Sequence, residues 1–295
     1  MNILGTGLSG LVGSRIVELL QDKYEFENIS RSEGVDITNK DQVVQKVSQS
    51  NSSIVLHLAA KTNVDSCEDD KKDGKDGEAW IVNVEGTRNI ADACLRFGKK
   101  LIYVSTDFVF NGEKSSDDKY GEEDIPSPVS WYGQTKLEGE NITQGLPQWI
   151  IARLAYPYRA KFVKDDFMRS IKNHLENHES ISVVSDQIFC PTLIDDLAVC
   201  IDRLISNNST GIFHTVGSQS LTPYDTALNI SEVFSLDKSL IKRTTRDDYF
   251  KNRVSRPFNL SLKNDKIKQL GVRMKSFEEG IREVKRQFDL EQEKL

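Results

Sequence analysis

The amino-acid sequence predicts an α/β fold in which a doubly wound parallel sheet is followed by a smaller C-terminal α/β region. A short apolar run at residues 1–4 leads directly into a glycine-rich stretch, and apolar residues at helical spacing follow over residues 14–20. Further along, apolar runs typical of strands alternate with helical patterns as far as residue 154. Such alternation favours right-handed βαβ units and therefore a parallel sheet.

After the first strand and helix, the first half of the chain contains four further strand signals and three helix signals between them. Strands are expected at apolar runs, two of them continuous as in strands buried on both faces: residues 26–30, 53–58, 101–105 and 149–154. Helices are expected where apolar residues recur at helical spacing: residues 41–47, 79–97 and 130–143. The hydrophilic stretches 65–78 and 113–124 are expected to be loops near the carboxyl ends of strands, where ligands bind in open α/β sheets.

After residue 155 the pattern loosens. The elements expected there are helices and one strand: helices at residues 167–175, 193–205 and 276–288, and a strand at 181–184. The charged residues 289–295 are expected to form a solvated tail.

The composition is that of an ordinary globular protein of one large or two small domains. A net charge of −6 does not suggest nucleic-acid binding, and no apolar run in the sequence is long enough to span a bilayer. The four cysteines form no C-x-x-C pair, and His174 and His178 lie among polar residues typical of a solvated helix face. We therefore expect a cytoplasmic protein with reduced thiols, no metal site, and neither a nucleic-acid nor a membrane partner.

Three glycines in the first turn favour nucleotide binding. Gly7 permits a tight turn, Gly10 lets a pyrophosphate approach the backbone, and Gly13 lets the following helix pack closely. The N–H groups that open the helix would face an anion, which the helix dipole also favours. A glycine-rich loop alone is often only a turn, so the prediction depends on its position between a strand and a helix.

A second group of residues suggests proton transfer. Tyr132 and Lys136 lie one turn apart on the same face of an expected helix. An ammonium beside a phenol would lower the phenol pKa from about 10, so that the tyrosine could exchange a proton with a substrate oxygen. Ser105 and Thr106 directly follow a buried strand, where a hydroxyl can reach a substrate carbonyl; turn or helix capping is their alternative role.

The order of these pieces resembles that of the extended short-chain dehydrogenase/reductases. Within that superfamily the chain is most similar to the dTDP-4-dehydrorhamnose reductases, over roughly residues 1–285. The similarity is carried by stretches along the whole chain: 6–13, 36–38, 58–65, 83–87, 105–112, 132–140, 186–187, 191–192 and 256–257.

The resemblance implies a role for each matching residue. Thr106 would hold the substrate carbonyl, Tyr132 would be the general acid, and Lys136 would lower the pKa of Tyr132 and hold the nicotinamide ribose. The implied cofactor-binding residues are Gly7, Leu8, Ser9, Gly10, Leu11, Val12, Arg31, Asp36, Ile37, Leu58, Ala59, Ala60, Thr62, Asn83, Tyr132 and Lys136. The implied substrate-binding residues are Ser105, Thr106, Asp107, Val109, Tyr156, Pro191 and Arg256.

The resemblance also implies a division of the chain. Residues 1–155, rejoined by about 185–215, would form an NAD(P)-binding Rossmann domain. Residues 156–295 would be mainly a substrate-binding region. Asn83 would support Lys136; its alternative role is that of an ordinary helix residue. Asp36 would cap the adenine; its alternative role is that of a helix N-cap.

The end of the second strand bears on the choice of cofactor. Enzymes of this type that use NAD commonly carry an acid there for the ribose 2′-hydroxyl. This chain instead has Arg31 between Ser30 and Ser32, which suits a 2′-phosphate. We therefore favour NADP(H), with NAD(H) as the alternative cofactor and a solvated surface arginine as the alternative role of Arg31.

Three departures from the family pattern concern the substrate and the cofactor cleft. Tyr156 stands where these reductases usually have a tryptophan, which puts the sugar preference in doubt. Lys61 replaces the tyrosine expected after the two alanines, and the segment 65–83 is several residues longer than the family pattern.

The function implied by the resemblance is an oxidoreductase of dTDP-rhamnose biosynthesis or a related pathway. It would be an NADPH-dependent reductase of a nucleotide-linked 4-keto-6-deoxy sugar, with hydride passing to C4 and Tyr132 as general acid, and a homodimer as the expected assembly. One alternative is a nucleotide-sugar epimerase or dehydratase with retained NAD. Another is a non-catalytic regulatory subunit similar to the β-subunit of methionine adenosyltransferase.

Overall fold

The computed structural model describes residues 1–292 and divides into two compact units. The first unit contains residues 1–111, 125–153 and 198–213. The second contains residues 112–124, 154–197 and the chain from residue 214 onward. The chain therefore passes between the units several times, and each unit is described by itself below.

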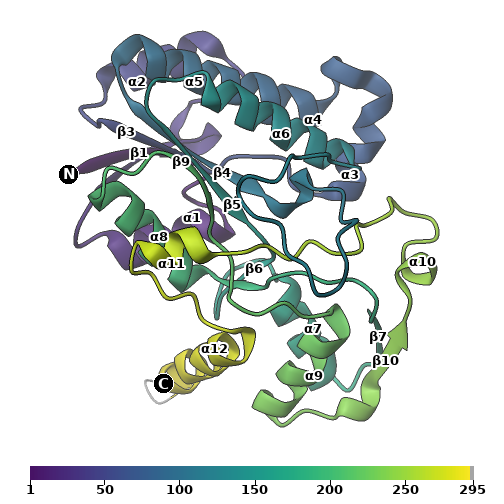
Figure 1. The fold of residues 1–295 in the computed structure, drawn as a ribbon. Helices are drawn as coiled ribbons and strands as arrows, with labels where there is room; N and C mark the ends of the chain where they lie inside the picture. Colours follow the sequence, from purple (N-terminus) through teal and green to yellow (C-terminus); the bar gives the residue numbers. More distant parts are fainter. Residues whose placement is uncertain (293–295) are drawn as a thin grey trace. The chain divides into compact units, whose positions relative to one another are not determined.

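A six-stranded sheet in the order β2-β1-β3-β4-β5-β9 forms the centre of the first unit (Figure 1). Its strands are β1 (Asn2–Thr6), β2 (Glu25–Ile29), β3 (Ile54–His57), β4 (Lys100–Thr106), β5 (Trp149–Leu154) and β9 (Gly211–His214). β1 pairs in parallel with β2 and β3, and β3 pairs in parallel with β4. The carboxyl ends of β1, β3 and β4 therefore meet at one edge, as the predicted α/β fold requires.

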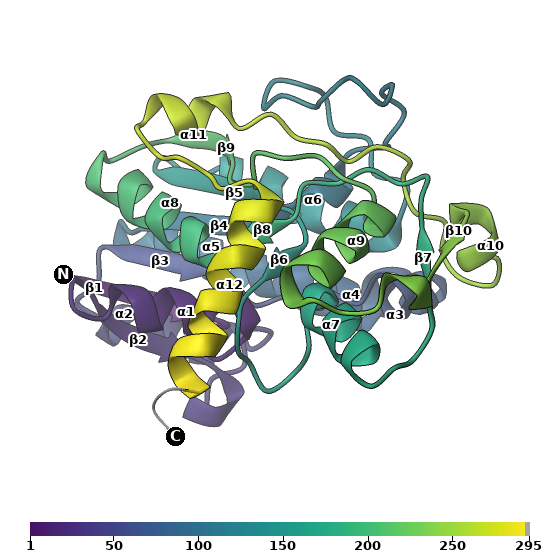
Figure 2. The same ribbon diagram turned by 90° about the horizontal axis from the view of Figure 1, so that it is seen from below.

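Helices cover both faces of this sheet, which confirms the predicted doubly wound fold. One face carries α2 (Lys40–Gln49), α5 (Gly86–Phe97) and α6 (Trp131–Gln144), and the other carries α1 (Leu11–Leu20) and α8 (Ile194–Ser206). The view from below places α1 and α8 on the near side of the sheet (Figure 2). Buried aliphatic side chains such as Leu4, Val47, Val55, Ile90 and Leu101 fill the layer between the sheet and α2 and α5.

The expectation of a loop at residues 65–78 is wrong. This segment forms helix α3 (Val64–Asp69) and a 3-10 helix (Asp70–Asp76), and α4 (Glu78–Trp80) follows. A π-helical turn (Ile81–Glu85) then leads straight into α5. The side chain of Asn63 caps α3 by accepting a hydrogen bond of 2.9 Å from the N–H of Ser66.

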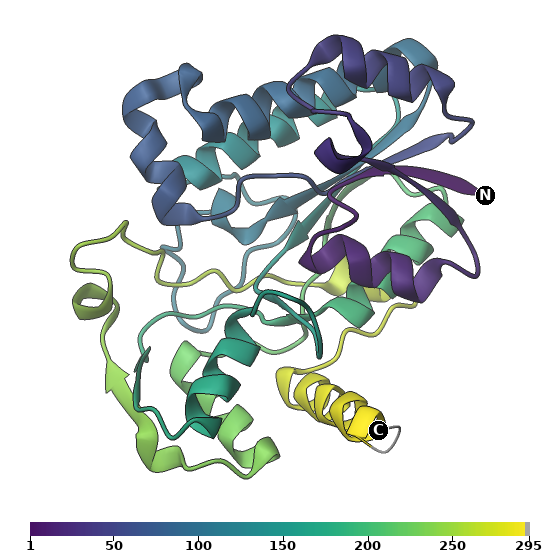
Figure 3. The same cartoon turned by 180° about the vertical axis from the view of Figure 1, so that it is seen from behind.

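Side chains of this segment also fix it against α6. Glu68 accepts a hydrogen bond of 2.7 Å from the N–H of Trp131, the first residue of α6, and the rings of Trp80 and Trp131 stack with centroids 5.6 Å apart. Cys67 and Ala79 are fully buried beneath the polar surface of the segment. Figure 3 shows the segment, in blue, beside α6. The composition of the segment is hydrophilic because one side faces solvent, and its few buried residues are enough to order it.

The second unit contains two small sheets and three main helices. β7 (Ile181–Val184) pairs in parallel with β10 (Ile241–Thr244), and β6 (Pro157–Tyr158) pairs with β8 (Thr192–Leu193). The main helices are α7 (Phe167–Glu176), α9 (Pro223–Phe234) and α12 (Phe277–Gln292), with short helices α10 (Arg246–Tyr249) and α11 (Asp265–Gln269). Tyr158, Met168, Ile230, Phe277 and Ile281 belong to one buried cluster of this unit.

Several elements of this part differ from the expectation. α9, β9 and β10 carry no strong sequence signal and were not expected. The last helix is longer than expected, because α12 continues past residue 288 to Gln292; Asp289 and Leu290 are exposed as expected of a solvated tail, and residues 293–295 lie outside the described part. The stretch 113–124 is irregular, as expected. Within residues 1–292, no helix is both long and apolar enough to cross a membrane.

Candidate active site

The glycine turn between β1 and α1 is closely packed on the end of β3. Gly7 has a φ of +69°, and a Cβ atom there would lie 2.8 Å from the backbone nitrogen of Ala59. A Cβ atom at Gly13 would overlap the carbonyl oxygen of Gly7, so that only glycine lets α1 start this close to the turn. At Gly10 the nearest contact of an added Cβ would be 3.2 Å from the same oxygen. The backbone of the turn is thus shaped for the close approach of a ligand.

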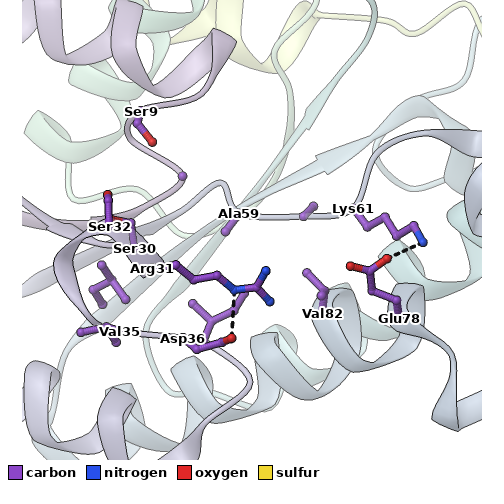
Figure 4. Close-up of a pocket in the computed structure, with 14 residues that line it drawn as sticks. Ser9, Ser30, Arg31, Ser32, Val35, Asp36, Ala59, Lys61, Glu78 and Val82 are labelled. Carbon is purple, nitrogen blue, oxygen red and sulfur yellow. Dashed lines mark hydrogen bonds and ion pairs between the residues drawn. The ribbon is translucent and has the colours of Figure 1, made fainter.

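A pocket of about 490 Å³ opens beside this turn (Figure 4). The predicted cofactor residues that line it are Gly7, Ser9, Arg31, Asp36, Ile37, Ala59 and Ala60. Further lining residues that the sequence did not assign to the cofactor are Ile29, Ser30, Ser32, Val35, Lys61, Glu78 and Val82. Leu8 is buried and packs over Gly5, while Asn83 is buried in the π-helical turn.

The polar end of the pocket is suited to an anion. The Nε of Arg31 donates a hydrogen bond of 2.9 Å to Asp36, and neither Nη group has a partner among residues 1–292. The backbone N–H of Thr38 and the Arg31 contact lower the pKa of Asp36, so that the carboxylate holds the guanidinium in place. Ser30 and Ser32 lie beside it with their hydroxyl oxygens 2.8 Å apart. An arginine held at Nε presents its two Nη groups for a bidentate contact with phosphate.

The other end of the pocket is closed by an ion-pair cluster. Lys61 lies 2.7 Å from both Asp70 and Glu78, and Asp70 also accepts a hydrogen bond of 2.9 Å from the N–H of Ala79. Burial opposes protonation of Lys61, but the bonds to the two carboxylates outweigh it and raise the Lys61 pKa. In the sequence, only the acidic residues of the long 65–83 segment pointed to such an ion-pair cluster. Lys61 was not identifiable as their partner without the fold.

The three predicted catalytic residues come together at the edge of the sheet. Thr106 ends β4, and Tyr132 and Lys136 lie on the first turns of α6. The side chain of Ser130 caps this helix by accepting a hydrogen bond of 3.1 Å from the N–H of Gly133. A Cβ atom at Gly133 would overlap the carbonyl oxygen of Phe108, so glycine allows α6 to pack tightly on the end of β4.

The predicted effect of Lys136 on Tyr132 is absent from this structure. Burial raises the pKa of the Tyr132 phenol, and a side-chain hydrogen bond with Thr106 only partly opposes that rise. Lys136 instead donates a hydrogen bond of 2.9 Å to the carbonyl oxygen of Val104, and burial lowers its pKa to about 7 against the opposing effect of Glu140. Burial therefore keeps the phenol protonated, which is the state that a general acid needs before it transfers its proton.

Asp107 adds an acid with a raised pKa next to this group. Its Oδ1 accepts a hydrogen bond of 2.9 Å from the hydroxyl of Thr106, and burial raises its pKa to about 7. Its Oδ2 and the Oγ of Ser105 are buried without a hydrogen-bond partner among the described residues. Unsatisfied buried polar atoms are rare and are typical of sites that receive a ligand. Val109, another predicted substrate-binding residue, also has a fully buried side chain.

Asn83 connects two parts of the site. Its Nδ2 donates hydrogen bonds of 3.0 Å to Thr135 and to the carbonyl oxygen of Lys61, and its Oδ1 accepts one of 2.7 Å from the N–H of Lys61. The bond of Asn83 to α6 is thus made to Thr135, the residue before Lys136, and the predicted support of Lys136 by Asn83 stays a prediction. The sequence did not assign a role to Thr135.

The remaining predicted substrate residues belong to the second unit. Tyr156 has a φ of +40°, its ring centroid lies 4.1 Å from that of Phe189, and its hydroxyl accepts a hydrogen bond of 3.4 Å from Gln187. A tyrosine in this backbone region is strained, which is typical of functional positions. Arg256 is buried, with its guanidinium 4.8 Å from the ring centroid of Phe250. Pro191 directly precedes β8, and its carbonyl oxygen packs against Gly217.

The sheet, the glycine turn and the Thr106–Tyr132–Lys136 group define an NAD(P)-dependent oxidoreductase of the short-chain dehydrogenase/reductase type. A family profile described as "RmlD substrate binding domain" matches residues 1–290. The chain belongs to this family.

Individual relatives agree with that assignment. A dTDP-4-dehydrorhamnose reductase of Aggregatibacter actinomycetemcomitans is 31% identical over 298 residues, covering 96% of this chain and 98% of the relative. The crystal structure of a dTDP-4-dehydrorhamnose reductase from Bacillus anthracis in complex with NADP is similar with a TM-score of 0.87, at 29% identity and 97% and 98% coverage. The methionine adenosyltransferase 2 subunit beta of Mus musculus is 27% identical over 95% of this chain and 86% of its own length.

Proposed function

We propose that this protein is an NADPH-dependent reductase of a nucleotide-linked 4-keto-6-deoxy sugar. The observation that carries the proposal is the buried phenol of Tyr132, which burial keeps protonated on the first turn of α6, together with Thr106 at the end of β4. The full-length similarity to dTDP-4-dehydrorhamnose reductases supports the substrate class. The bound cofactor would supply the hydride, which would pass to C4 of the sugar.

In this proposal each side chain has one task at the carbonyl. The unpartnered Oγ of Ser105 and the hydroxyl of Thr106, which would turn from Asp107 to the substrate, would hold the substrate oxygen, and Tyr132 would transfer its phenolic proton to that oxygen as negative charge develops. Lys136, which Val104 and the Tyr103 ring hold on one side, would hold the nicotinamide ribose. Tyr156, Pro191 and Arg256 of the second unit would bind the sugar and its diphosphate, for which a guanidinium is well suited.

The choice of NADP(H) over NAD(H) rests on the anion-suited end of the pocket. The residues fit a 2′-phosphate, because Arg31 is held at Nε with both Nη groups available and Ser30 and Ser32 lie beside it. Asp36 takes part by orienting Arg31 and by lining the adenine side of the same pocket. A homodimer and a cytoplasmic location remain predictions.

The proposal is tested by offering the purified protein a panel of nucleotide sugars and following NADPH absorbance. We expect oxidation of NADPH with a dTDP-linked 4-keto-6-deoxy sugar and little with small ketones, because remote binding of the nucleotide contributes to positioning C4. Conversion of a sugar without net loss of NADPH would favour the epimerase or dehydratase alternative. Binding of NADPH without conversion of any sugar would favour the regulatory-subunit alternative.

A further inference from the structure

A buried hydrogen-bonded line begins at the glycine turn of the cofactor pocket. The hydroxyl oxygen of Thr6, directly before Gly7, accepts hydrogen bonds from the N–H groups of Leu58 (3.2 Å) and Ala59 (3.0 Å). It also lies 2.6 Å from Nδ1 of His57, which is buried at the end of β3. A hydroxyl has two acceptor positions and one hydrogen. The acceptor positions take the N–H of Ala59 and the N–H of Leu58, which is shared with the carbonyl oxygen of Thr6 at 3.2 Å, so the Thr6 hydrogen is directed to Nδ1.

The other ring nitrogen of His57 faces α5. Nε2 lies 3.0 Å from the hydroxyl oxygen of Thr87, and that hydroxyl donates a hydrogen bond of 2.7 Å to the carbonyl oxygen of Asn83. Because Thr87 has given its hydrogen to Asn83, it can only accept from His57. Both ends of the ring therefore require a neutral imidazole that carries its proton on Nε2.

The charged and titratable groups that face His57 agree with this state. Burial and the charge of Lys136 lower the pKa of His57 to about 3, and the ring of Tyr103 lies with its centroid 5.7 Å away. The neutral state is thus expected throughout the physiological pH range.

The line continues from Asn83 to the catalytic helix. The Nδ2 of Asn83 donates to the hydroxyl oxygen of Thr135 at 3.0 Å, and Thr135 donates in turn to the carbonyl oxygen of Tyr132 at 2.8 Å. All these side chains are buried to more than nine-tenths. Each hydroxyl, amide and ring nitrogen in the line has a single allowed direction, which makes the line rigid.

We propose that His57 is a positioning residue that holds the glycine turn of the cofactor pocket and the first turn of α6 in one hydrogen-bonded line. Through Thr6 it fixes the backbone of Ala59, against which Gly7 packs. Through Thr87 and Asn83 it fixes Thr135 and the backbone of Tyr132. This inference uses the cofactor chemistry common to the family and does not depend on the identity of the sugar.

The first test reads the ring of His57 directly by ¹⁵N NMR of protein labelled at histidine, with His57→Phe to assign the signal. We expect a neutral ring with Nε2–H and no titration between pH 8 and pH 5. A ring protonated at Nδ1, or a signal that titrates in this range, would overturn the proposal.

The second test separates positioning from simple stability, using NADPH affinity from fluorescence titration. His57→Phe keeps a ring of similar size but leaves Thr6 without an acceptor, and we expect NADPH binding to weaken roughly tenfold. His57→Asn offers Oδ1 to Thr6 and should restore affinity to within about threefold of the natural protein. Unchanged affinity in His57→Phe, or no recovery in His57→Asn, would contradict the proposed role.

The helix end of the line is tested by amide hydrogen exchange with a matched pair of variants. Thr135→Val removes the hydroxyl that joins Asn83 to Tyr132. Thr143→Val removes an equally buried hydroxyl of the same helix, which donates 2.8 Å to the carbonyl oxygen of Gly139 outside the line. We expect faster exchange over residues 131–136 in His57→Phe and Thr135→Val, but not in Thr143→Val. Equal exchange there in all three variants would show that the line does not hold the helix.

Discussion

The Nζ of Lys136 donates a hydrogen bond of 2.9 Å to the carbonyl oxygen of Val104 and lies 4.1 Å from the ring centroid of Tyr103. The ammonium is thus held from one side by β4, and its pKa is lowered to about 7 mainly by burial. A bound ribose would give this group further hydrogen-bond acceptors. We therefore propose that the tyrosine–lysine pair serves cofactor binding as well as proton transfer.

Removal of the lysine should accordingly damage two properties. In Lys136→Ala we expect weaker NADPH binding and much lower kcat, because the group is proposed to hold the ribose and to act beside Tyr132. Fluorescence titration and steady-state rates measure the two effects separately. A variant that loses only one of them would assign Lys136 a single role.

Removal of the phenolic hydroxyl should affect turnover alone. In Tyr132→Phe we expect NADPH affinity close to that of the natural protein and a rate lower by roughly 10²–10⁴-fold, the usual contribution of proton transfer. Tyr24→Phe is the control, because Tyr24 is also buried but donates its hydrogen bond of 2.6 Å to Asp202, outside the site. Turnover of Tyr132→Phe at the rate of the control would remove the proposed mechanism.

Arg31→Ala should discriminate between the two nicotinamide cofactors. We expect NADPH binding to weaken about tenfold or more and NADH binding to change little, since only NADPH carries the 2′-phosphate. Arg88→Ala is the control, because Arg88 is an exposed arginine that pairs with Glu85 on α5. Equal losses for both cofactors by titration calorimetry would assign Arg31 to the protein surface.

Asp107 should make stability depend on pH. Burial raises its pKa from 3.8 to about 7, so the folded protein binds a proton that the unfolded chain releases between these values. The stability from this group is fully present below about pH 4 and is lost as pH rises through 7. The Asp107→Asn variant cannot titrate at this position. As pH rises over this range, its free energy of unfolding should therefore increase relative to that of the natural protein by at most about 4 kcal/mol. Urea denaturation at several pH values measures this difference, and parallel curves would contradict the burial effect.

The sequence was sufficient for the fold because its strands are buried on both faces. Runs such as residues 53–58 and 101–105 stand out as apolar, and the three glycines mark the first turn. The helical nature of residues 65–78 was missed because it depends on a few tertiary contacts, such as the bond of Glu68 to Trp131 and the burial of Cys67, within a polar segment. Local composition cannot reveal packing partners so far apart in the chain.

The candidate site shows the same division. The sequence motifs were sufficient to propose Thr106, Tyr132 and Lys136, which the fold brings to one edge of the sheet. The raised pKa values of Tyr132 and Asp107 were not foreseeable, since burial causes both. The hydrogen-bond directions through His57 likewise require the positions of partners on β1, β3 and α5.

The central claim is that this protein transfers a hydride from NADPH to C4 of a nucleotide-linked 4-keto-6-deoxy sugar. It is tested most directly with NADPH carrying deuterium at the transferred position of the nicotinamide, followed by NMR of the sugar product. The account predicts one deuterium at C4 of the product for each NADPH oxidised, and none at other ring positions. Product without deuterium at C4, or a sugar converted with no NADPH consumed, would contradict it.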